Sequence, residues 1–224
     1  MADWHRRDLS ALWHPCTQMA EHPDTLPLTA IRSGSGGWLE DIDGRRYLDA
    51  ISSWWTNLFG HAEPRIAEAI AEQARTLEHV IFAGFSHSPG LELAERLIAR
   101  APKGLSRVFF ADNGSAAVEI ALKMSFHSFA NQGISGRNRF IALANSYHGE
   151  TLGALSMADI PLYRQVYAPL LLDPVFAPSP DFGNRQPGEN EADCALRCAD
   201  ALRRLVEQHR HELCALIIEP LVQC

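Results

Sequence analysis

Three residues at the start of an expected helix are suited to bind an anion. Asn113, Gly114 and Ser115 follow the apolar run 108–111 and precede a long helical pattern. The first turn of a helix has N–H groups without intrahelical acceptors and lies at the positive end of the helix dipole. Small residues let a phosphate approach that backbone closely. Asn and Ser are also common helix caps, so an ordinary helix start with nothing bound is the alternative.

Two further polar segments follow apolar runs. Tyr147 and His148 come after the run 139–144, and Glu219 ends the run 214–219. Ligands of parallel sheets bind beyond the carboxyl ends of the strands, so we expect these side chains to share one edge with Ser115. A ring, an imidazole, a carboxylate and an anion-binding turn suit a planar phosphorylated cofactor with Tyr147 stacked on it. The alternatives are a packing role for Tyr147 and a solvated loop position for His148.

Pyridoxal phosphate fits this set of residues better than a dinucleotide does. A dinucleotide site of the Rossmann type needs G-x-G-x-x-G directly after a strand and before a helix. The segment Gly34-Ser35-Gly36-Gly37 has neither that spacing nor that position. The cofactor expected from the residues is therefore pyridoxal 5'-phosphate.

The elements that must position these residues alternate between strand and helix. A hairpin is predicted at 38–49, around the turn at Asp43-Gly44. Apolar spacing predicts helices at 64–78, 89–101, 115–130, 151–157 and 192–211, strands at 107–111, 139–144 and 214–219, and an irregular connection at 173–191. This order predicts an α/β fold with a mostly parallel sheet and flanking helices.

Composition excludes several classes of function. The formal net charge of -7 disfavours a nucleic-acid partner. The longest apolar runs fall short of the roughly 20 residues that span a bilayer, and the N-terminus lacks the apolar core of a signal peptide. We therefore expect a cytoplasmic protein with no membrane partner.

The five cysteines are odd in number and lack C-x-x-C spacing, which predicts reduced thiols. Cys194 and Cys198 could share a helix face with His209 and His211 downstream, but this spacing matches no standard zinc site. No metal is expected.

Several segments resemble the class III aminotransferases of the type I pyridoxal-phosphate fold. They occur in family order and are Leu12-Trp13-His14-Pro15 with Thr17-Gln18-Met19, Ser52-Ser53-Trp54-Trp55, Asn113-Gly114-Ser115-Ala116-Ala117-Val118-Glu119, Tyr147-His148-Gly149-Glu150-Thr151 and Ile217-Ile218-Glu219-Pro220. The third and fourth are widespread in class III. W-H-P together with S-S-W-W is typical of the aminotransferases of biotin synthesis. Two alternatives stay open, namely another class III enzyme of the ω-amino-acid or acetylornithine type, and a non-catalytic remnant.

The resemblance implies roles for individual residues around the cofactor. Gly114 and Ser115 would hold the phosphate of pyridoxal phosphate. Tyr147 would lie against the cofactor ring and the substrate, and Glu219 would border the cofactor. The reaction implied is the transfer of an amino group from S-adenosylmethionine to 8-amino-7-oxononanoate, which gives 7,8-diaminononanoate, in a homodimeric enzyme.

The resemblance also implies a substrate pocket near the N-terminus, lined by Trp54 and Cys16. The family usually has an aromatic residue where Cys16 stands, and a thiol replaces neither a ring nor a phenolic hydrogen bond. Adjacent residues of a strand point to opposite faces, so one of Trp54 and Trp55 is expected to pack in the core. Trp54 is taken as the functional one.

The type I fold implied by the resemblance is incomplete in this chain. Residues 1–60 would form the N-terminal part of a small α+β domain, and residues 61–224 the first part of the large cofactor-binding domain. The family places its Schiff-base lysine further downstream than Cys224. Lys103, in a polar turn, and Lys123, well along a helix, do not suit that role. We therefore expect an N-terminal portion of a longer enzyme that is inactive alone.

Overall fold

The computed structural model describes residues 2–25 and 28–220, and the chain divides into two compact units. The N-terminal unit comprises Met1–Arg96, and the C-terminal unit comprises Leu97–Cys224. The domain boundary expected after residue 60 stays a prediction. In the described parts of the chain, no helix is both long and apolar enough to cross a membrane.

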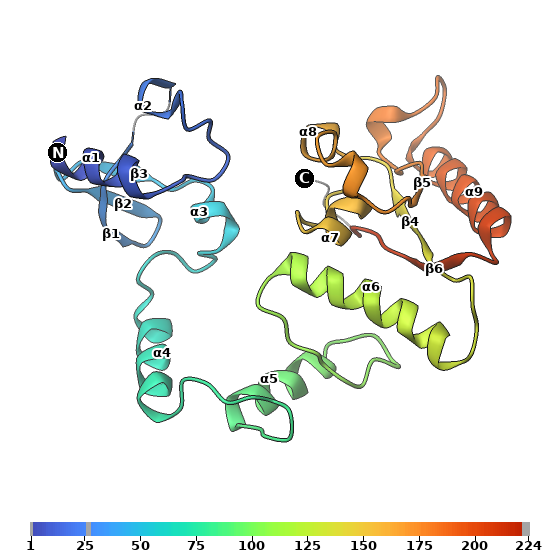
Figure 1. Cartoon of the computed structure of the whole chain (residues 1–224), viewed down its shortest axis with the longest axis horizontal. Helices are drawn as coiled ribbons and strands as arrows, with labels where there is room; N and C mark the ends of the chain where they lie inside the picture. The colour runs from blue at the N-terminus through green and yellow to red at the C-terminus, as the bar shows by residue number, and fades with distance from the viewer. Residues whose placement is uncertain (1, 26–27, 221–224) are drawn as a thin grey trace. The chain divides into compact units, whose positions relative to one another are not determined.

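The N-terminal unit contains a three-stranded antiparallel sheet (Figure 1). Its strands, in spatial order, are β1 (Ile31–Ser35), β2 (Trp38–Asp41) and β3 (Arg46–Leu48). β2 and β3 form the predicted hairpin, with Gly44 at φ +82°, a value that glycine adopts without strain. Two helices precede the sheet in the chain, α1 (Ala2–Ala11) and α2 (His22–Thr25).

The segment Ser52–Trp55, whose two tryptophans were expected to alternate as on a strand, is instead a tight helical turn, α3. All four of its residues have positive φ, between 47° and 68°. The expectation that one tryptophan packs in a core is wrong for this chain, because Trp54 and Trp55 are 59% and 69% exposed. Side chains alternate between two faces only along a strand, and the backbone at 52–55 forms a helical turn instead.

Two amphipathic helices follow, and both were predicted from their apolar spacing. α4 spans Pro64–Thr76, with Pro64 in its first turn and Glu63 as its N-cap. α5 spans Ser88–Ile98 and crosses the division between the units. Neither helix has a buried residue among those described.

The C-terminal unit contains a three-stranded parallel sheet in the order β5-β4-β6. The strands are β4 (Arg139–Leu143), β5 (Val175–Ala177) and β6 (Leu213–Leu216). The helical elements of this unit are α6 (Gly114–Asn131), α7 (Leu152–Met157), α8 (Pro161–Arg164), η1 (Ala168–Leu170), η2 (Phe182–Asn184) and α9 (Glu191–His209). Alternation of strands and helices with parallel pairing confirms the predicted α/β class.

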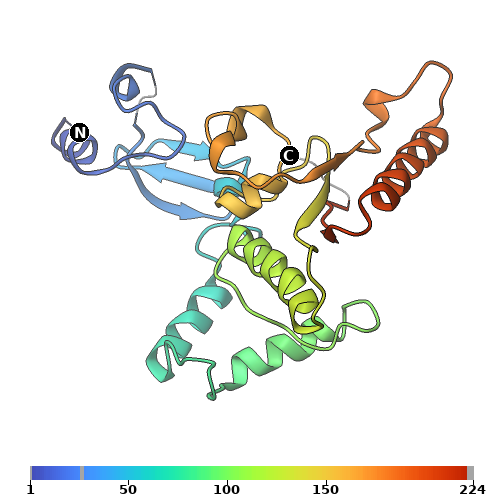
Figure 2. The ribbon, with the colours of Figure 1, turned by 45° about the vertical axis from the view of Figure 1, so that its right-hand side comes forward.

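Each face of the parallel sheet is covered by different helices, as Figures 1 and 2 show. Ile141 and Leu143 of β4 belong to an apolar cluster with Leu202 and Leu205 of α9. Phe140 and Ala142 point the other way because side chains alternate along a strand, and they join a cluster built on α6 and α7. Burial on both faces explains why the four residues 140–143 are all apolar.

Two sequence predictions in this unit were wrong. The run 107–111, predicted as a strand, has no regular secondary structure. An apolar run becomes a strand only where a neighbouring strand completes its hydrogen bonds, and the described sheet consists of β5, β4 and β6. Conversely, the connection 173–191, predicted to be irregular, contains β5 and η2. The proline and glycine content of this connection led to a prediction of irregular structure, although three of its residues pair with β4 as a strand.

Candidate functional site

The start of α6 has the geometry of an anion-binding helix terminus. Asn113 is the N-cap, and its Oδ1 accepts the N–H of Ala116 at 2.8 Å. Because Gly114 and Ser115 lie in the first turn, their N–H groups have no intrahelical acceptor. A Cβ built on Gly114 would meet no atom within 4 Å. The helix therefore begins beside open space, with backbone donors in its first turn.

The segment after β4 brings Tyr147 next to Glu219. The buried Ser146 hydroxyl donates to the carbonyl of Met157 at 3.0 Å, which fixes the start of the segment on α7. The next residue, Tyr147, donates its backbone N–H to Glu219 Oε2 at 2.8 Å. The Tyr147 ring stacks edge to face on Tyr163, with centroids 5.8 Å apart. Residues 72 positions apart in the chain thus meet at the carboxyl ends of β4 and β6.

The same segment joins Tyr147 to the start of α6. Glu150 donates its N–H to Ser115 Oγ at 3.2 Å, and its carboxylate accepts the Tyr147 hydroxyl at 3.1 Å. Gly149 makes this approach possible, because a Cβ there would lie 2.2 Å from Ser115 Oγ. The structure therefore brings Ser115, Tyr147 and Glu219 together, as the sequence predicts.

Two glutamates of this cluster were missed by sequence reasoning as site residues, Glu150 and Glu119. Glu119 lies one helical turn beyond Ser115 and accepts the N–H groups of Gly153 and Ala154 at 2.7 and 3.2 Å. It thereby caps α7 from another helix. Its four-residue spacing from Ser115, which places both on one helix face, was the available signal.

His148 lies within this cluster and carries an unpaired buried atom. Within the described part of the chain, its Nε2 is buried without a hydrogen-bond partner. Burial lowers the pKa of His148 below its ordinary value of 6.5, and the charge of Glu219 partly opposes that shift. A neutral imidazole with one unused nitrogen beside a carboxylate can receive or supply one hydrogen bond to a bound molecule.

These residues fit a phosphorylated planar ligand. The Ser115 hydroxyl accepts a bond from Glu150 and keeps its own proton to donate to an anion. The open space beside Gly114 leaves room for a phosphate at the helix start. Beyond it the cluster offers an aromatic ring on Tyr147, a carboxylate on Glu219 and the unused nitrogen of His148. A phosphate, a ring and polar ring substituents would each find a partner in this set.

Two of the three predicted substrate residues, Cys16 and Trp54, lie in the N-terminal unit. Cys16 follows α1 in a loop, is exposed and has a φ of 55°. It lines an open hollow with Trp13 and Gln18. Trp54 projects from the turn α3. Their placement against the cluster of the C-terminal unit stays a prediction.

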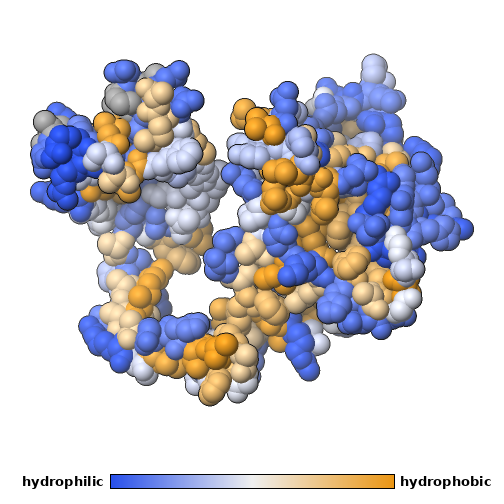
Figure 3. Space-filling model, viewed as in Figure 1, coloured by the Kyte–Doolittle hydropathy of each residue, from blue (hydrophilic) through white to orange (hydrophobic). Residues whose placement is uncertain are grey.

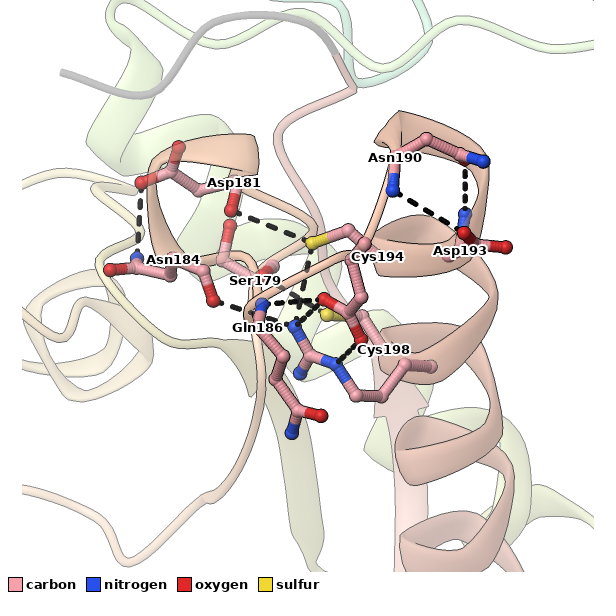
Figure 4. A network of polar contacts seen from close by, with 10 residues as sticks. Ser179, Asp181, Asn184, Gln186, Asn190, Asp193, Cys194 and Cys198 are labelled. Atoms are coloured by element: carbon pink, nitrogen blue, oxygen red, sulfur yellow. Dashed lines mark hydrogen bonds and ion pairs between the residues drawn. The ribbon is translucent and has the colours of Figure 1, made fainter.

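The cysteines of α9 contact carbonyl groups of the preceding connection (Figure 4). The buried Cys198 thiol donates to the carbonyl of Ser179 at 3.3 Å, and burial raises its pKa. Cys194 lies 3.8 Å from the carbonyl of Asp181. His209 pairs with Glu212 at the far end of α9, eleven residues beyond Cys198 and so about 16 Å along the helix axis.

These contacts do not form a metal site from Cys194 and Cys198 with the downstream histidines. Over residues 2–25 and 28–220, no group of three or more His, Cys, Asp and Glu side chains is arranged to hold a metal ion. Cys16, Cys194, Cys198 and Cys214 are free thiols, as predicted, and Cys224 lies outside the described residues.

Comparison with known proteins matches residues 19–224 to the class III aminotransferases. The adenosylmethionine-8-amino-7-oxononanoate aminotransferase of Helicobacter pylori is 45% identical over 218 residues, which are 97% of this chain and 47% of that protein. The enzyme of that name from Geobacter sulfurreducens is 41% identical and is matched over all of this chain and 49% of its own length.

Solved structures agree with the sequence matches. The crystal structure of adenosylmethionine-8-amino-7-oxononanoate aminotransferase from Methanocaldococcus jannaschii superposes with a TM-score of 0.87 at 35% identity, over 99% of this chain and 48% of that one. The omega transaminase of Pseudomonas jessenii in complex with PMP gives a TM-score of 0.89 at 30% identity, over 97% and 48%.

The chain spans about half the length of the curated relatives it matches. The match nevertheless covers almost all of this chain, and the parallel sheet with its flanking helices is common to the sequence prediction and the solved transaminases. The chain therefore belongs to the class III aminotransferase family.

Proposed function

We propose that the protein containing this chain transfers an amino group from S-adenosylmethionine to 8-amino-7-oxononanoate and forms 7,8-diaminononanoate for biotin synthesis. The observation that carries the proposal is the 45% identity, over 97% of the chain, to a relative named for this reaction. The segments W-H-P and S-S-W-W support the same branch of the family.

The cofactor of the proposal is pyridoxal 5'-phosphate. When bound, it would carry the amino group between the two half-reactions and withdraw electrons from the carbon that loses a proton. A solved relative in complex with PMP supports a phosphorylated pyridine ligand for this fold. The start of α6, with Gly114 and Ser115, would bind the phosphate.

The remaining residues of the cluster would orient the ligand and control protons. The Tyr147 ring would lie along the cofactor ring, and the Tyr147 hydroxyl is held by Glu150 at 3.1 Å. Glu219 fixes the backbone at Tyr147 and keeps a negative charge beside His148. Trp54 and Cys16 would contact the substrate, as the family pattern implies.

The amine that forms the covalent link to the cofactor would come from outside this chain. Lys123 lies nine residues beyond Gly114 on α6, about 13 Å along the helix axis, and is exposed. Lys103 is exposed in the connection before the helix. We therefore assign neither lysine a role in the chemistry, and we expect the 224-residue chain to bind the cofactor without a covalent link.

The test is to express the reading frame extended beyond codon 224 and compare it with the 224-residue chain. The extended protein should convert 8-amino-7-oxononanoate with S-adenosylmethionine, and it should restore growth without biotin to cells that lack this step. The 224-residue chain should do neither. Turnover with ornithine or an ω-amino acid, and none with S-adenosylmethionine, would favour another class III reaction. A frame closed directly after codon 224 would favour a non-catalytic remnant.

A further inference from the structure

The turn α3, which carries Trp54, has an unusual backbone. Ser52, Ser53, Trp54 and Trp55 have φ values of 51°, 47°, 68° and 64°. Residues with a side chain rarely adopt this left-handed region, because the Cβ approaches the following carbonyl oxygen. Four such residues in succession without a glycine persist only where surrounding contacts hold them.

Asp49 supplies two of these contacts through its two carboxylate oxygens. Oδ1 accepts the backbone N–H of Ser53 at 2.9 Å, and Oδ2 accepts the hydroxyl of Ser53 at 2.7 Å. These two bonds lower the pKa of Asp49 to about 2, so the side chain is a carboxylate at neutral pH. Asp49 therefore fixes both the backbone and the side chain of the residue just before Trp54.

His61 anchors Asp49 to the sheet of the N-terminal unit. Its Nε2 lies 2.8 Å from Asp49 Oδ2, and it must be the donor because the carboxylate has no proton to give. The backbone of His61 exchanges hydrogen bonds of 3.1 and 2.8 Å with Gly36, between β1 and β2. Asp49 donates its own N–H to the carbonyl of Gly37 at 2.9 Å. The turn is thus tied to a hairpin well before it in the chain.

The tryptophan side chains depend on this backbone for their direction. Trp54 and Trp55 are more than half exposed, so packing within the unit does not orient their rings. A change in the dihedral angles of Ser53 would redirect the Cα–Cβ bond of Trp54 directly.

We propose that Asp49, anchored by His61, is a positioning residue that sets the direction in which Trp54 faces the substrate. The proposal rests on the proposed function in one respect, since it takes Trp54 as a substrate contact. The contact of Asp49 with the turn does not depend on any activity.

Asp41 provides a matched control from the same sheet. Its side chain is 5% exposed and that of Asp49 is 6% exposed, and it accepts the N–H groups of Asp43 and Arg45 at 2.9 and 2.8 Å and the hydroxyl of Tyr47 at 2.8 Å. Its bonds hold the β2–β3 hairpin rather than α3. The variant Asp41→Asn therefore weakens a similar set of bonds without touching the turn that carries Trp54.

The first measurement uses the 224-residue chain labelled with 5-fluorotryptophan. The chain has five tryptophans, and the fluorine signals of the turn are assigned with Trp54→Phe and Trp55→Phe. Asp49→Asn should shift or broaden the Trp54 and Trp55 signals, and Ser53→Ala should do so less, because it removes one bond of the two. Asp41→Asn should leave both signals in place. An unchanged Trp54 signal in Asp49→Asn, with its far-UV spectrum unaltered, would overturn the proposal.

The second measurement uses the extended enzyme of the proposed function. Asp49→Asn should raise KM for the amino acceptor about tenfold and leave kcat within about threefold, the pattern of lost substrate positioning. Asp41→Asn should change KM by less than about twofold. Equal effects of both variants would reduce Asp49 to a stabilising role and contradict the proposal. A wild-type enzyme without transamination would contradict the proposed function, while the fluorine signals would still decide whether Asp49 fixes the turn.

Discussion

Gly149 is the residue whose lack of a side chain lets the segment after β4 approach the start of α6. Its φ is +121°, and a Cβ there would lie 2.2 Å from Ser115 Oγ. Gly149→Ala should lower the free energy of unfolding by about 1–3 kcal/mol, because the alanine strains the backbone and displaces Ser115. Urea unfolding followed by far-UV circular dichroism measures this loss.

Gly133 is the matched control for this substitution. It also has a positive φ, +72°, but a Cβ there would meet no atom within 4 Å. Gly133→Ala therefore tests backbone strain without the clash, and its loss of stability should be smaller. Equal losses in the two variants would show that contact with Ser115 has no energetic consequence.

The pKa of His148 reports on the environment of the cluster. Burial lowers it below 6.5, and Glu219 opposes this shift. Glu219→Gln should lower the pKa further, because the favourable interaction of the carboxylate with the charged imidazole is lost. A folded-state pKa below the unfolded value means that the unfolded chain binds more protons. The contribution of neutral His148 to the free energy of unfolding should therefore be fully present above about pH 6.5. It should decrease as the pH falls toward the folded-state pKa.

Proton NMR titration of the His148 ring, assigned with His148→Gln, measures this pKa directly. The same titration in Glu219→Gln gives the sign of the contribution from the carboxylate. A His148 pKa above 6.5 in the unaltered chain, or a rise in Glu219→Gln, would contradict the described burial.

The helix α7 begins with a cap that another helix supplies. Its N-cap residue, Thr151, makes no side-chain capping bond. Glu119 of α6 instead accepts the N–H groups of Gly153 and Ala154. Glu119→Ala should cost about 0.5–2 kcal/mol of stability, the range for a lost N-cap, and speed hydrogen exchange at both amides.

Thr151→Ala is the comparison for this capping prediction. Because its hydroxyl does not cap the helix, the substitution should change stability by no more than about 0.5 kcal/mol. If Thr151→Ala cost as much as Glu119→Ala, the helix start would not depend on α6.

The elements that sequence could predict are those whose signal is local. α4, α6 and α9 each carry their periodicity within one segment, and Asn113 is the cap that its position suggested. The turn at 52–55 could not be predicted, because Asp49, which holds its left-handed residues, is itself fixed by His61 and Gly37, each twelve residues away in the chain. The strand pattern at 107–111 failed for a related reason, since pairing depends on neighbours distant in sequence.

The residues of the candidate site likewise include some that the sequence could predict and some that depend on the folded structure. The polar residues after β4 and β6 were predictable, because parallel strands bring their carboxyl ends to one edge. The bond between Glu150 and Ser115 depends on the φ of Gly149, which residue types do not specify. The roles of Glu119 and Glu150 are therefore products of the folded arrangement.

Much apolar side-chain surface of the described residues is exposed. Figure 3 shows such residues over α4, where Ile66 and Ile70 are 44% and 64% exposed. They line an open hollow of about 870 Å³ within the N-terminal unit, together with Ala69 and Ala74. A soluble chain seldom leaves so much apolar surface in contact with water unless another surface covers it.

We expect the 224-residue chain in its folded form to bind the hydrophobic dye ANS at α4. The dye would remove the two isoleucines from water, and replacing both with glutamine should weaken its binding about tenfold. The double variant Ile66→Gln/Ile70→Gln should retain the far-UV spectrum, because neither side chain is buried. Glu68→Gln/Glu72→Gln changes the same helix outside the hollow and should leave dye binding unaltered. Dye fluorescence that is equal in all three proteins would place the accessible apolar surface elsewhere.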